Sequence, residues 1–325
     1  MTLRFAAIGL DHRHIYHMVG ELLAAGAECA GFCPETSDPR VLQGFHERFP
    51  ALAPRPREAL FDDPAVDIIL CAAIPRDRPG IAIRAMRAGK DVMLDKPGAV
   101  NLAQCAELER VAADTGRILS ICFSERLAVR ACVAAERLVA EGAIGRVIHT
   151  TGLGPHRLNR AIRPEWFFRP ETFGGILTDI ASHQIDQFMV FTGSDRAEVV
   201  SASSANRGLP DLPGFEDFGE LLLRSDRASG FVRVDWFTPD GLPTWGDGRL
   251  FLLGTEGTIE LRKYVDIAGR PGADHLFLTN REGVLHLDAS AEPLTYFARF
   301  LADVRDRSAA AMPKGHALQV TRLAI

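Results

Sequence analysis

An aspartate and a histidine four positions apart are the clearest proton-handling pair in this chain. Asp179 and His183 follow Gly174-Gly175 in a segment that is otherwise mostly apolar. Residues four apart on a helix share a face, so we expect the carboxylate and the imidazole to lie side by side. Imidazole titrates near neutral pH and often serves as a general base. An ordinary surface pair is the alternative interpretation of the same spacing.

A lysine comes directly after a predicted strand. The apolar run of residues 92–94 ends in Asp95-Lys96-Pro97, and ligands of open parallel sheets bind at the carboxyl ends of strands. Removing a hydride from a carbinol carbon requires the hydroxyl proton to leave, so His183 is the candidate general base. Lys96 would stabilise the alkoxide and Asp179 would orient the sugar or the base, while a cofactor accepts the hydride. A solvated lysine at a strand end is the alternative.

The first turn of the chain has the form of a nucleotide-binding loop, with substitutions. A strand, a turn and a helix in succession bring the phosphates of a dinucleotide to a helix N-terminus. Of the three glycines in G-x-G-x-x-G only Gly9 is present, because Asp11 and His14 stand at the second and third positions. A side chain at the second position hinders the pyrophosphate, and a carboxylate there repels it unless it turns away.

Three histidines follow Gly9 at a spacing that is similar to that of metal ligands. His12, His14 and His17 are candidates, but the sequence shows no carboxylate or thiol cluster brought near them, and we predict no metal. We expect these side chains either to cap the first helix in solvent or to line the cofactor cleft.

The turn after the second predicted strand bears on the choice of cofactor. An acid there normally holds the adenosine ribose, and Glu35 could reach it. Ser37 and Arg40 could instead accept a 2'-phosphate. NAD and NADP are therefore both possible.

The bulk composition favours a two-domain enzyme of small molecules. The chain has 325 residues, 47% hydrophobic and 24% charged, with a net charge of -5, which favours neither disorder nor a nucleic-acid surface. The six cysteines include no C-x-x-C pair and are predicted to be reduced core residues of a cytoplasmic protein. A strand begins almost at the first residue, so we expect no signal peptide and no membrane anchor.

The first third of the chain alternates between strands and helices, which predicts a doubly wound parallel sheet of the Rossmann type. The predicted strands are Leu3–Ile8, Cys29–Phe32, Ile68–Ala72, Val92–Leu94 and Ile118–Cys122, and the helices are Ile15–Ala25, Pro39–Phe49, Pro79–Ala88 and Leu102–Thr115.

The rest of the chain is predicted to be an α+β domain with a large, mostly antiparallel open sheet. The predicted strands are Val147–Leu153, Val199–Ala205, Glu216–Arg224, Gly230–Trp236, Leu250–Leu253 and Thr258–Arg262, and the helices are Leu127–Glu141, Ile176–Phe191 and Leu294–Arg307. We place the domains at 1–123 and 124–325, with the last stretch, His316–Ile325, able to pack back on the first domain.

Taken together, these motifs resemble the Gfo/Idh/MocA oxidoreductases over most of the chain. Gly9, Asp95-Lys96-Pro97 and the pair of Asp179 with His183 carry the resemblance, and the turn at 254–261 is similar to the sheet-domain turn of that family. The resemblance implies a Rossmann domain, a C-terminal sheet domain, and a sugar or polyol bound between them over the nicotinamide. Lys96, Asp179 and His183 then correspond to the catalytic lysine, aspartate and histidine.

The resemblance also implies a set of contact residues. The cofactor-binding set is Gly9, Asp11, His12, His14, Glu35, Ser37, Ala73, Pro75, Lys96 and Pro97, and the substrate-binding set is Lys96, His156, Trp166, Asp179 and His183. Arg157 and Asp186 are further substrate candidates. The aromatic run at 166–168 could stack on a sugar ring or belong to the core.

Two positions depart from the pattern of the family. Asp95 replaces the usual glutamate, and Ile74 to Pro79 replace Thr-Pro-x-x-x-His. Arg76 and Arg78 then face the cofactor or an anionic substrate, or they form a solvated loop.

Three functions fit these residues. The first is an NAD(P)-dependent dehydrogenase or reductase of a sugar, cyclic polyol or sugar acid. The second is a glycosidase that oxidises and re-reduces its sugar with a retained cofactor, and the third is a non-catalytic sensor of nucleotide or sugar. A proton acceptor beside a cation favours an enzyme. A homodimer or homotetramer is what the resemblance implies.

Overall fold

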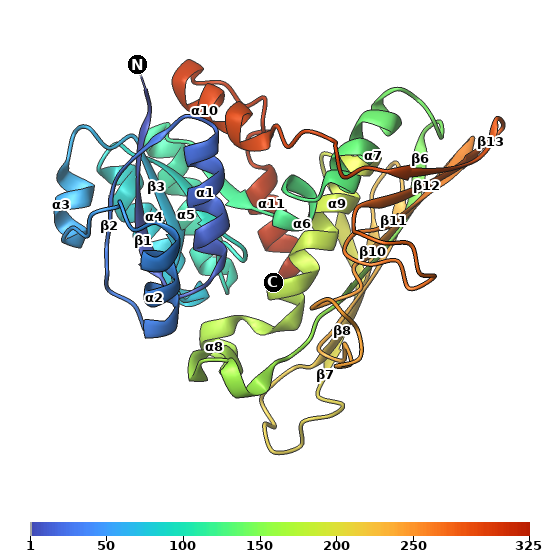
Figure 1. Ribbon diagram of the computed structural model, residues 1–325, viewed down its shortest axis with the longest axis horizontal. Helices are drawn as coiled ribbons and strands as arrows, with labels where there is room; N and C mark the ends of the chain where they lie inside the picture. The colour runs from blue at the N-terminus through green and yellow to red at the C-terminus, as the bar shows by residue number, and fades with distance from the viewer. Residues whose placement is uncertain (1) are drawn as a thin grey trace.

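The computed structural model describes residues 2–325, which form two β-sheets with helices between them (Figure 1). The first sheet is parallel with the strand order β2-β1-β3-β4-β5, and the second has the order β13-β12-β11-β10-β6-β9-β8-β7. Within the second sheet all neighbouring strands are antiparallel except β6 and β9. The predicted fold class is confirmed.

The first sheet is built from short apolar strands that are buried on both faces, as expected of a parallel sheet covered by helices. In β3 and β4 every residue is buried. The strands are β1 (Arg4–Leu10), β2 (Glu28–Phe32), β3 (Ile68–Ala72), β4 (Asp91–Asp95) and β5 (Leu119–Cys122), and the helices are α1 (His14–Ala24), α2 (Pro39–Arg48), α3 (Arg57–Asp62), α4 (Arg78–Arg87) and α5 (Leu102–Thr115). Helix α3 was not predicted, because its six residues are too few to show a helical period.

The second sheet alternates buried and exposed residues, so one face packs on the core. Its strands are β6 (Val147–Pro155), β7 (Glu198–Ala205), β8 (Phe218–Arg224), β9 (Ser229–Asp235), β10 (Arg249–Gly254), β11 (Gly257–Arg262), β12 (His275–Asn280) and β13 (Gly283–Asp288). The sequence analysis missed β12 and β13. They pair in register around a tight turn, from Asn280 with Gly283 to His275 with Asp288. Most of β13 is exposed, so it lacks a clear apolar signal.

Two helices differ from the prediction because each is interrupted. The predicted helix Leu127–Glu141 is divided into α6 (Ser124–Leu127) and α7 (Arg130–Ala140). The predicted helix Ile176–Phe191 begins as a π-helical turn, Leu177–Ala181, and continues as α9 (Ser182–Thr192). The short helix α8 (Pro170–Phe173) comes before the π-helical turn and α9.

The C-terminal helices connect the two sheets. Helix α10 covers Tyr296–Asp306, and α11 covers His316–Ala324. Figure 1 shows α11 between the sheets, where it contacts both α5 and α9. The last stretch of the chain therefore packs against the first sheet layer, and we still infer a domain boundary after residue 123.

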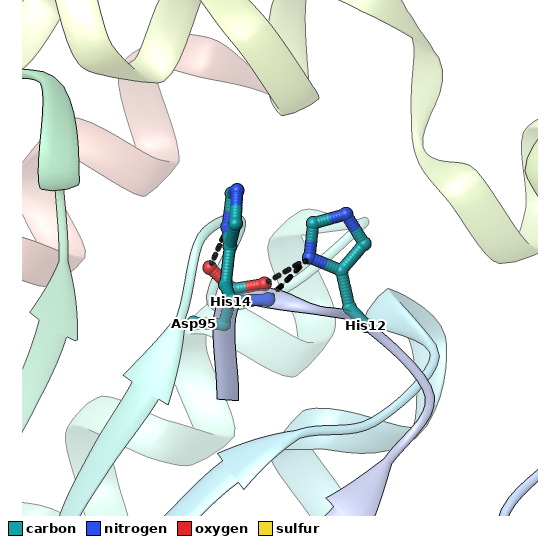
Figure 2. A group of neighbouring side chains, drawn as sticks. All are labelled: His12, His14 and Asp95. Atoms are coloured by element: carbon teal, nitrogen blue, oxygen red, sulfur yellow. Dashed lines mark hydrogen bonds and ion pairs between the residues drawn. The ribbon is translucent and has the colours of Figure 1, made fainter. Parts of the chain in front are cut away.

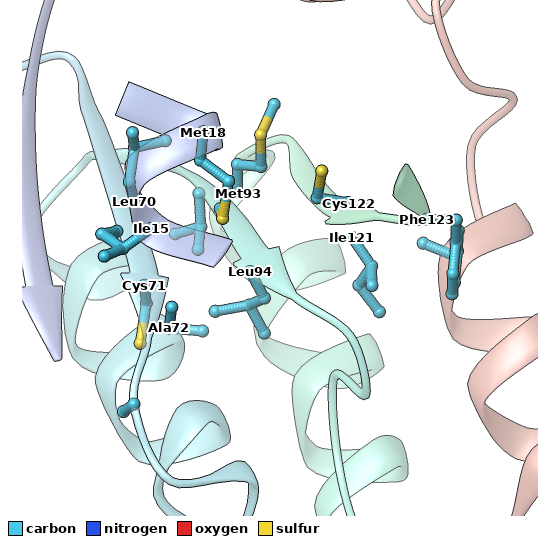
Figure 3. Packing of buried hydrophobic residues seen from close by; sticks show 14 of the residues in the cluster. Ile15, Met18, Leu70, Cys71, Ala72, Met93, Leu94, Ile121, Cys122 and Phe123 are labelled. Atoms are coloured by element: carbon cyan, nitrogen blue, oxygen red, sulfur yellow. The ribbon is translucent and has the colours of Figure 1, made fainter. Parts of the chain in front are cut away.

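The apolar core supports the end of the first sheet that carries Lys96. Figure 3 shows Ile15 and Met18 of α1 packed over Leu70, Met93 and Leu94 of the central strands. All six cysteines are free thiols, and five of them are buried. Among residues 2–325 no helix has the length and apolar character needed to cross a membrane.

Candidate active site

The structure brings Lys96, Asp179 and His183 together between the two sheets. The Lys96 ammonium donates to Asp179 Oδ1 at 2.8 Å and to the Asp179 carbonyl oxygen at 3.1 Å. Lys96, Asp179 and His183 are all buried. An ammonium group has three donors, so Lys96 keeps one for another acceptor. Lys96 and Asp179 thus form a buried pair, and the charge of Lys96 also acts on His183.

Local backbone structure explains how Asp179 reaches Lys96. The π-helical turn that contains Asp179 follows two glycines in the left-handed region, Gly174 (φ 89°) and Gly175 (φ 85°). A Cβ on Gly175 would lie 2.4 Å from Glu216 Oε2, and one on Gly174 would lie 2.9 Å from Val100 Cγ1. The two glycines therefore permit a close approach of this segment to its neighbours, which any side chain would hinder.

His183 is held in its neutral form. Its pKa is lowered to about 3, first by burial and then by the charges of Lys96 and Lys263, while the charge of Glu125 opposes them. The prediction that this imidazole titrates near neutral pH is therefore wrong, because desolvation penalises the imidazolium. Its Nδ1 atom is sealed from solvent and has no hydrogen-bond partner among residues 2–325.

The Asp95 carboxylate contacts three side chains of the first domain, two of which, His12 and His14, are drawn in Figure 2. His14 Nδ1 lies 2.8 Å from Asp95 Oδ1, and His12 Nδ1 lies 3.3 Å from Oδ2. The buried Arg78 places Nη2 2.9 Å from Oδ2. Burial alone would raise the pKa of Asp95, but the charges of His14 and Arg78 outweigh it and hold that pKa well below its usual range.

This cluster corrects the expectation that no carboxylate lies near the histidines. Asp95 is distant in sequence, but β4 lies next to β3 and β3 next to β1, so the strand ends meet. His12, His14 and Asp95 lie close enough together to hold a metal ion. Arg78 already neutralises the carboxylate, and it also donates to the carbonyl oxygens of Asp95 and Pro97, so it does not lie in a solvated loop. Figure 2 shows the two imidazole rings on either side of the carboxylate.

The residues around Gly9 fit a dinucleotide. Gly9 has φ 78°, and a Cβ there would lie 2.5 Å from the Ala73 Cβ. A cleft of about 640 Å³ is lined by Gly9, Asp11, Ala73, Arg57 and Arg76, among others, and such a volume suits a cofactor.

The substituted loop leaves donors for phosphate. Asp11 turns away, since its Oδ1 accepts from Ser37 N at 2.5 Å and from Ser37 Oγ at 2.7 Å. The N–H groups of His12 and Arg13 have no acceptor within the described part of the chain. They lie at the start of α1, where free N–H groups and the helix dipole favour anions.

The adenosine end of the cleft is occupied by internal pairs. Glu35 pairs with Arg57 at 2.6 Å, and Arg40 binds Asp38 and the carbonyl oxygen of Ile162. Ser37 is engaged by Asp11, so neither Ser37 nor Arg40 is free for a 2'-phosphate. Arg57 was missed, because only the fold brings it beside the second strand. NAD and NADP stay open at this site.

The two prolines of the predicted cofactor set stand at turns. Pro75 is buried and begins a 3-10 turn, Pro75–Asp77, after β3. Pro97 follows Lys96 through a cis peptide bond. Arg76 pairs with Asp77 and is exposed.

Glu125 is a buried carboxylate that the sequence analysis missed. Its Oε2 accepts from Lys263 at 2.7 Å and from Gln184 at 3.1 Å, and its Oε1 has no hydrogen-bond partner among residues 2–325. His156 Nε2 lies 3.9 Å from that Oε1 atom. Lys263 holds the pKa of Glu125 at about 2 against the effect of burial.

The predicted substrate residues lie in different parts of the structure. His156 lies near the cluster, against Trp236 and Trp245 at centroid distances of 5.4 and 4.5 Å. Trp166 lines a small cavity beside His12. Arg157 donates to carbonyl oxygens of the 239–242 loop, an anchoring role.

Asp186 does not belong to the site. It is fully buried and pairs with Arg126 at 2.6 Å and His316 at 2.7 Å. These contacts tie α9 to α6 and to α11, so Asp186 stabilises the packing of the domains.

Comparison with known domains covers most of the chain. Residues 27–123 match the domain described as an oxidoreductase family with an NAD-binding Rossmann fold. Residues 132–260 match the GFO/IDH/MocA C-terminal domain.

Characterised relatives match in shorter stretches. The D-xylose dehydrogenase of Paenarthrobacter nicotinovorans is 32% identical over 131 residues, 39% of this chain and 34% of that protein. The 1,5-anhydro-D-fructose reductase of Ensifer adhaerens is 33% identical over 157 residues, 46% of this chain and 45% of that protein. The matched regions thus span less than half the length of these relatives.

Solved structures match over the whole chain. A crystal structure from Erwinia carotovora atroseptica, described as an oxidoreductase, is 45% identical with a TM-score of 0.95 and covers 100% of this chain and 97% of that one. A levoglucosan dehydrogenase in complex with NADH and levoglucosan is 18% identical with a TM-score of 0.79, covering 100% and 95%. The latter likeness shows the fold alone.

Proposed function

Since the chain belongs to the Gfo/Idh/MocA oxidoreductase family, we propose that it transfers a hydride between a nicotinamide cofactor, NAD or NADP, and a sugar, cyclic polyol or sugar acid. The observation that carries the proposal is the buried Lys96–Asp179 pair beside His183, at the carboxyl end of a parallel strand. The nicotinamide ring supplies the hydride chemistry when it is bound. The names of the relatives, which include dehydrogenases and reductases of sugars and inositols, support the same reaction class.

Lys96 is the electrostatic group of the proposed reaction. Two of its three donors engage Asp179, so the third can bind the oxygen on which negative charge develops. Asp179 fixes the direction of that donor. Because the pair is buried, the interaction with an alkoxide is stronger than it would be in water.

His183 is the proposed general acid and base. In its neutral form it accepts the hydroxyl proton as the hydride leaves the carbon. A base with a low pKa is weak, and Glu125 is the neighbour that raises its proton affinity. The proton therefore resides on His183 only briefly and passes to solvent after the reaction.

The proposal is tested in two steps. Fluorescence titration with NADH and NADPH measures which nucleotide binds, and a panel of sugars, polyols and sugar acids with the preferred nucleotide measures turnover. We expect one nucleotide to be reduced or oxidised with part of the panel. Nucleotide binding without turnover on the whole panel would favour a sensor, and cleavage of glycosides without net nucleotide turnover would favour a glycosidase.

We also infer that two chains pair through the open face of the second sheet. Exposed apolar residues lie on this face, including Leu222, Leu253 and Val284, and large exposed apolar areas mark interaction surfaces. We expect the protein to be cytoplasmic. Its molar mass in light scattering should be that of a homodimer or a homotetramer. A monomer at micromolar concentration would contradict it.

A further inference from the structure

A small cavity separates the substituted phosphate loop from the segment that follows β6. Its volume is about 150 Å³, and its lining includes Arg13 and His12 from the first domain and Asn159, Arg163 and Trp166 from the second. The pair of Arg40 with the carbonyl oxygen of Ile162 closes one side. The cavity thus lies between the domains, and His12, which lines it, also contacts Asp95, the residue before Lys96.

Arg163 is fixed in this cavity without a carboxylate partner. Its Nε donates to the Leu158 carbonyl oxygen at 2.9 Å. Its guanidinium lies over Phe167 and Trp236, 4.4 and 5.1 Å from the ring centroids. No acid within the described residues comes within 4 Å to form an ion pair with it. The side chain is therefore oriented by stacking, and its terminal donors are left for another group.

Arg13 adds a second guanidinium to the lining of the cavity. Trp166 lines it as well, with an indole Nε1 that is sealed from solvent. Burial lowers the pKa of Arg163, the charge of Asp179 opposes this, and the charge of Arg13, which makes no ion pair within residues 2–325, lowers it further. Two guanidinium groups that repel one another across a small cavity are stabilised when an anion binds between them.

The acids in the lining are already engaged. Asp11 accepts from Ser37, and Asp38 accepts from Arg40 through Nε and Nη2 at 2.9 Å each. Asp179, whose charge is felt by Arg163, is paired with Lys96. None of these carboxylates satisfies Arg163, and each has a partner that reduces its repulsion of an entering anion.

We propose that Arg163, with Arg13, binds the carboxylate of the substrate, so that this chain acts on a sugar acid rather than on a neutral sugar or polyol. The proposal rests on the proposed function and narrows its substrate class. The carboxylate lies in the cavity, and the hydroxyl to be oxidised lies at Lys96 and His183. Guanidinium and carboxylate match in geometry, and hydrogen bonds between charged groups are the strong ones.

The cofactor pyrophosphate is the other anion that could enter this region, because Arg13 belongs to the phosphate loop. The two sources differ in what they require. Arg163 belongs to the second domain, so a substrate carboxylate makes it a specificity residue, whereas a cofactor phosphate makes it part of nucleotide affinity. The experiment separates these two cases.

The test is calorimetric titration of the complex with NADH, in which no hydroxyl can be oxidised, so that binding is measured without turnover. The probes are matched pairs, D-gluconate against D-glucitol and erythronate against erythritol, which differ in one carboxylate. We expect each acid to bind at least about tenfold more tightly than its alditol. Arg163→Met, which keeps the apolar stem, should weaken the acids about 10- to 100-fold and leave the alditols and NADH within about twofold.

Two further variants keep the result interpretable. Arg160→Met is the matched control, since Arg160 is exposed and pairs with Asp211 outside the cavity, and it should change nothing. Arg13→Gln, at an exposed position, should weaken the acids even if Arg163→Met does not fold. Equal affinity for acids and alditols, or equal weakening of NADH and acids by Arg163→Met, would overturn the proposal. Failure of NADH to bind would count against the proposed function instead. Titration of the acids without nucleotide would then show whether the cavity binds a carboxylate.

Discussion

Buried polar groups next to the phosphate loop, around Asp95, differ from those on the substrate side of the site, around His183, in whether they have partners within the protein. Around Asp95 the polar groups pair with one another, with His14 at 2.8 Å and Arg78 at 2.9 Å. Around His183, polar atoms of His183 and Glu125 have no protein partner within residues 2–325. Leaving such an atom unpaired costs about 1–3 kcal/mol. We infer that the network around Asp95 holds the phosphate loop in place for the cofactor and that the region around His183 is shaped for the substrate.

The comparison also explains the departures from the family pattern. His12 and His14 replace or follow loop glycines, Asp95 replaces a glutamate, and Arg78 precedes the position where the family often has a histidine. The side chains of His12, His14 and Arg78 all contact the Asp95 carboxylate. Changes that look like damage to separate motifs are thus one connected network.

The largest expected effect is on the substrate side. We predict that His183→Ala lowers turnover about 10²- to 10⁴-fold, because it removes the proposed proton acceptor. Nucleotide affinity and thermal stability should change little. Steady-state kinetics and fluorescence titration measure both, with the exposed His46→Ala as control. Unchanged turnover would refute the role of His183.

The network around Asp95 should respond in the opposite sense. We predict that Asp95→Ala lowers the free energy of unfolding by about 3–5 kcal/mol, because it leaves the buried Arg78 unpaired. Denaturant unfolding measures this loss. The double variant Asp95→Leu with Arg78→Leu should recover part of it, since both charges are then removed. A loss from Asp95→Ala of less than about 1 kcal/mol would mean that the network is not structural.

Acid should destabilise the substrate side through His183. Its pKa is lowered from 6.5 to about 3 in the folded protein, so the unfolded chain binds the proton more readily and stability falls as the pH drops. The stabilising contribution is fully present above pH 6.5 and is lost between pH 6.5 and 3, by up to about 1.4 kcal/mol per pH unit. Unfolding of His183→Gln should show a shallower acid limb than the wild type. Parallel acid limbs would contradict the neutral, buried state of this histidine.

The smallest effect is expected at the second glycine position. Asp11 is turned toward Ser37, so we predict that Asp11→Asn changes nucleotide affinity by less than about threefold. Calorimetry with the preferred nucleotide measures it. Tightening by tenfold or more would show that the carboxylate does repel the pyrophosphate, and the phosphate loop would then not be a settled scaffold.

Much of the architecture was accessible from local patterns. The alternation of apolar strands with amphipathic helices predicted the parallel sheet, and the types and positions of Lys96 and Asp179 pointed to the pair that they form. The π-helical turn at Asp179 and the break between α6 and α7 were not predictable, because a helical period over ten or more residues hides a local change in hydrogen bonding. Strand β13 was missed because most of its residues are exposed.

Other residues of the candidate site have no local signal at all. Glu125 is recognisable only through Lys263, 138 residues away in the chain. Arg163 is an ordinary loop arginine until Phe167 and Trp236 stack against it. Arg57 enters the nucleotide cleft only because the fold of the first domain brings the start of α3 there.

The sequence by itself determined the elements and the residue types, because hydrophobic period, glycine positions and strand-end polar residues act over short distances along the chain. Only the tertiary structure decided which groups are charged and which are paired. Burial and neighbours from distant segments set those properties, as in the neutral His183 and the network at Asp95. The chemistry of the site therefore follows from contacts between segments that no local pattern encodes.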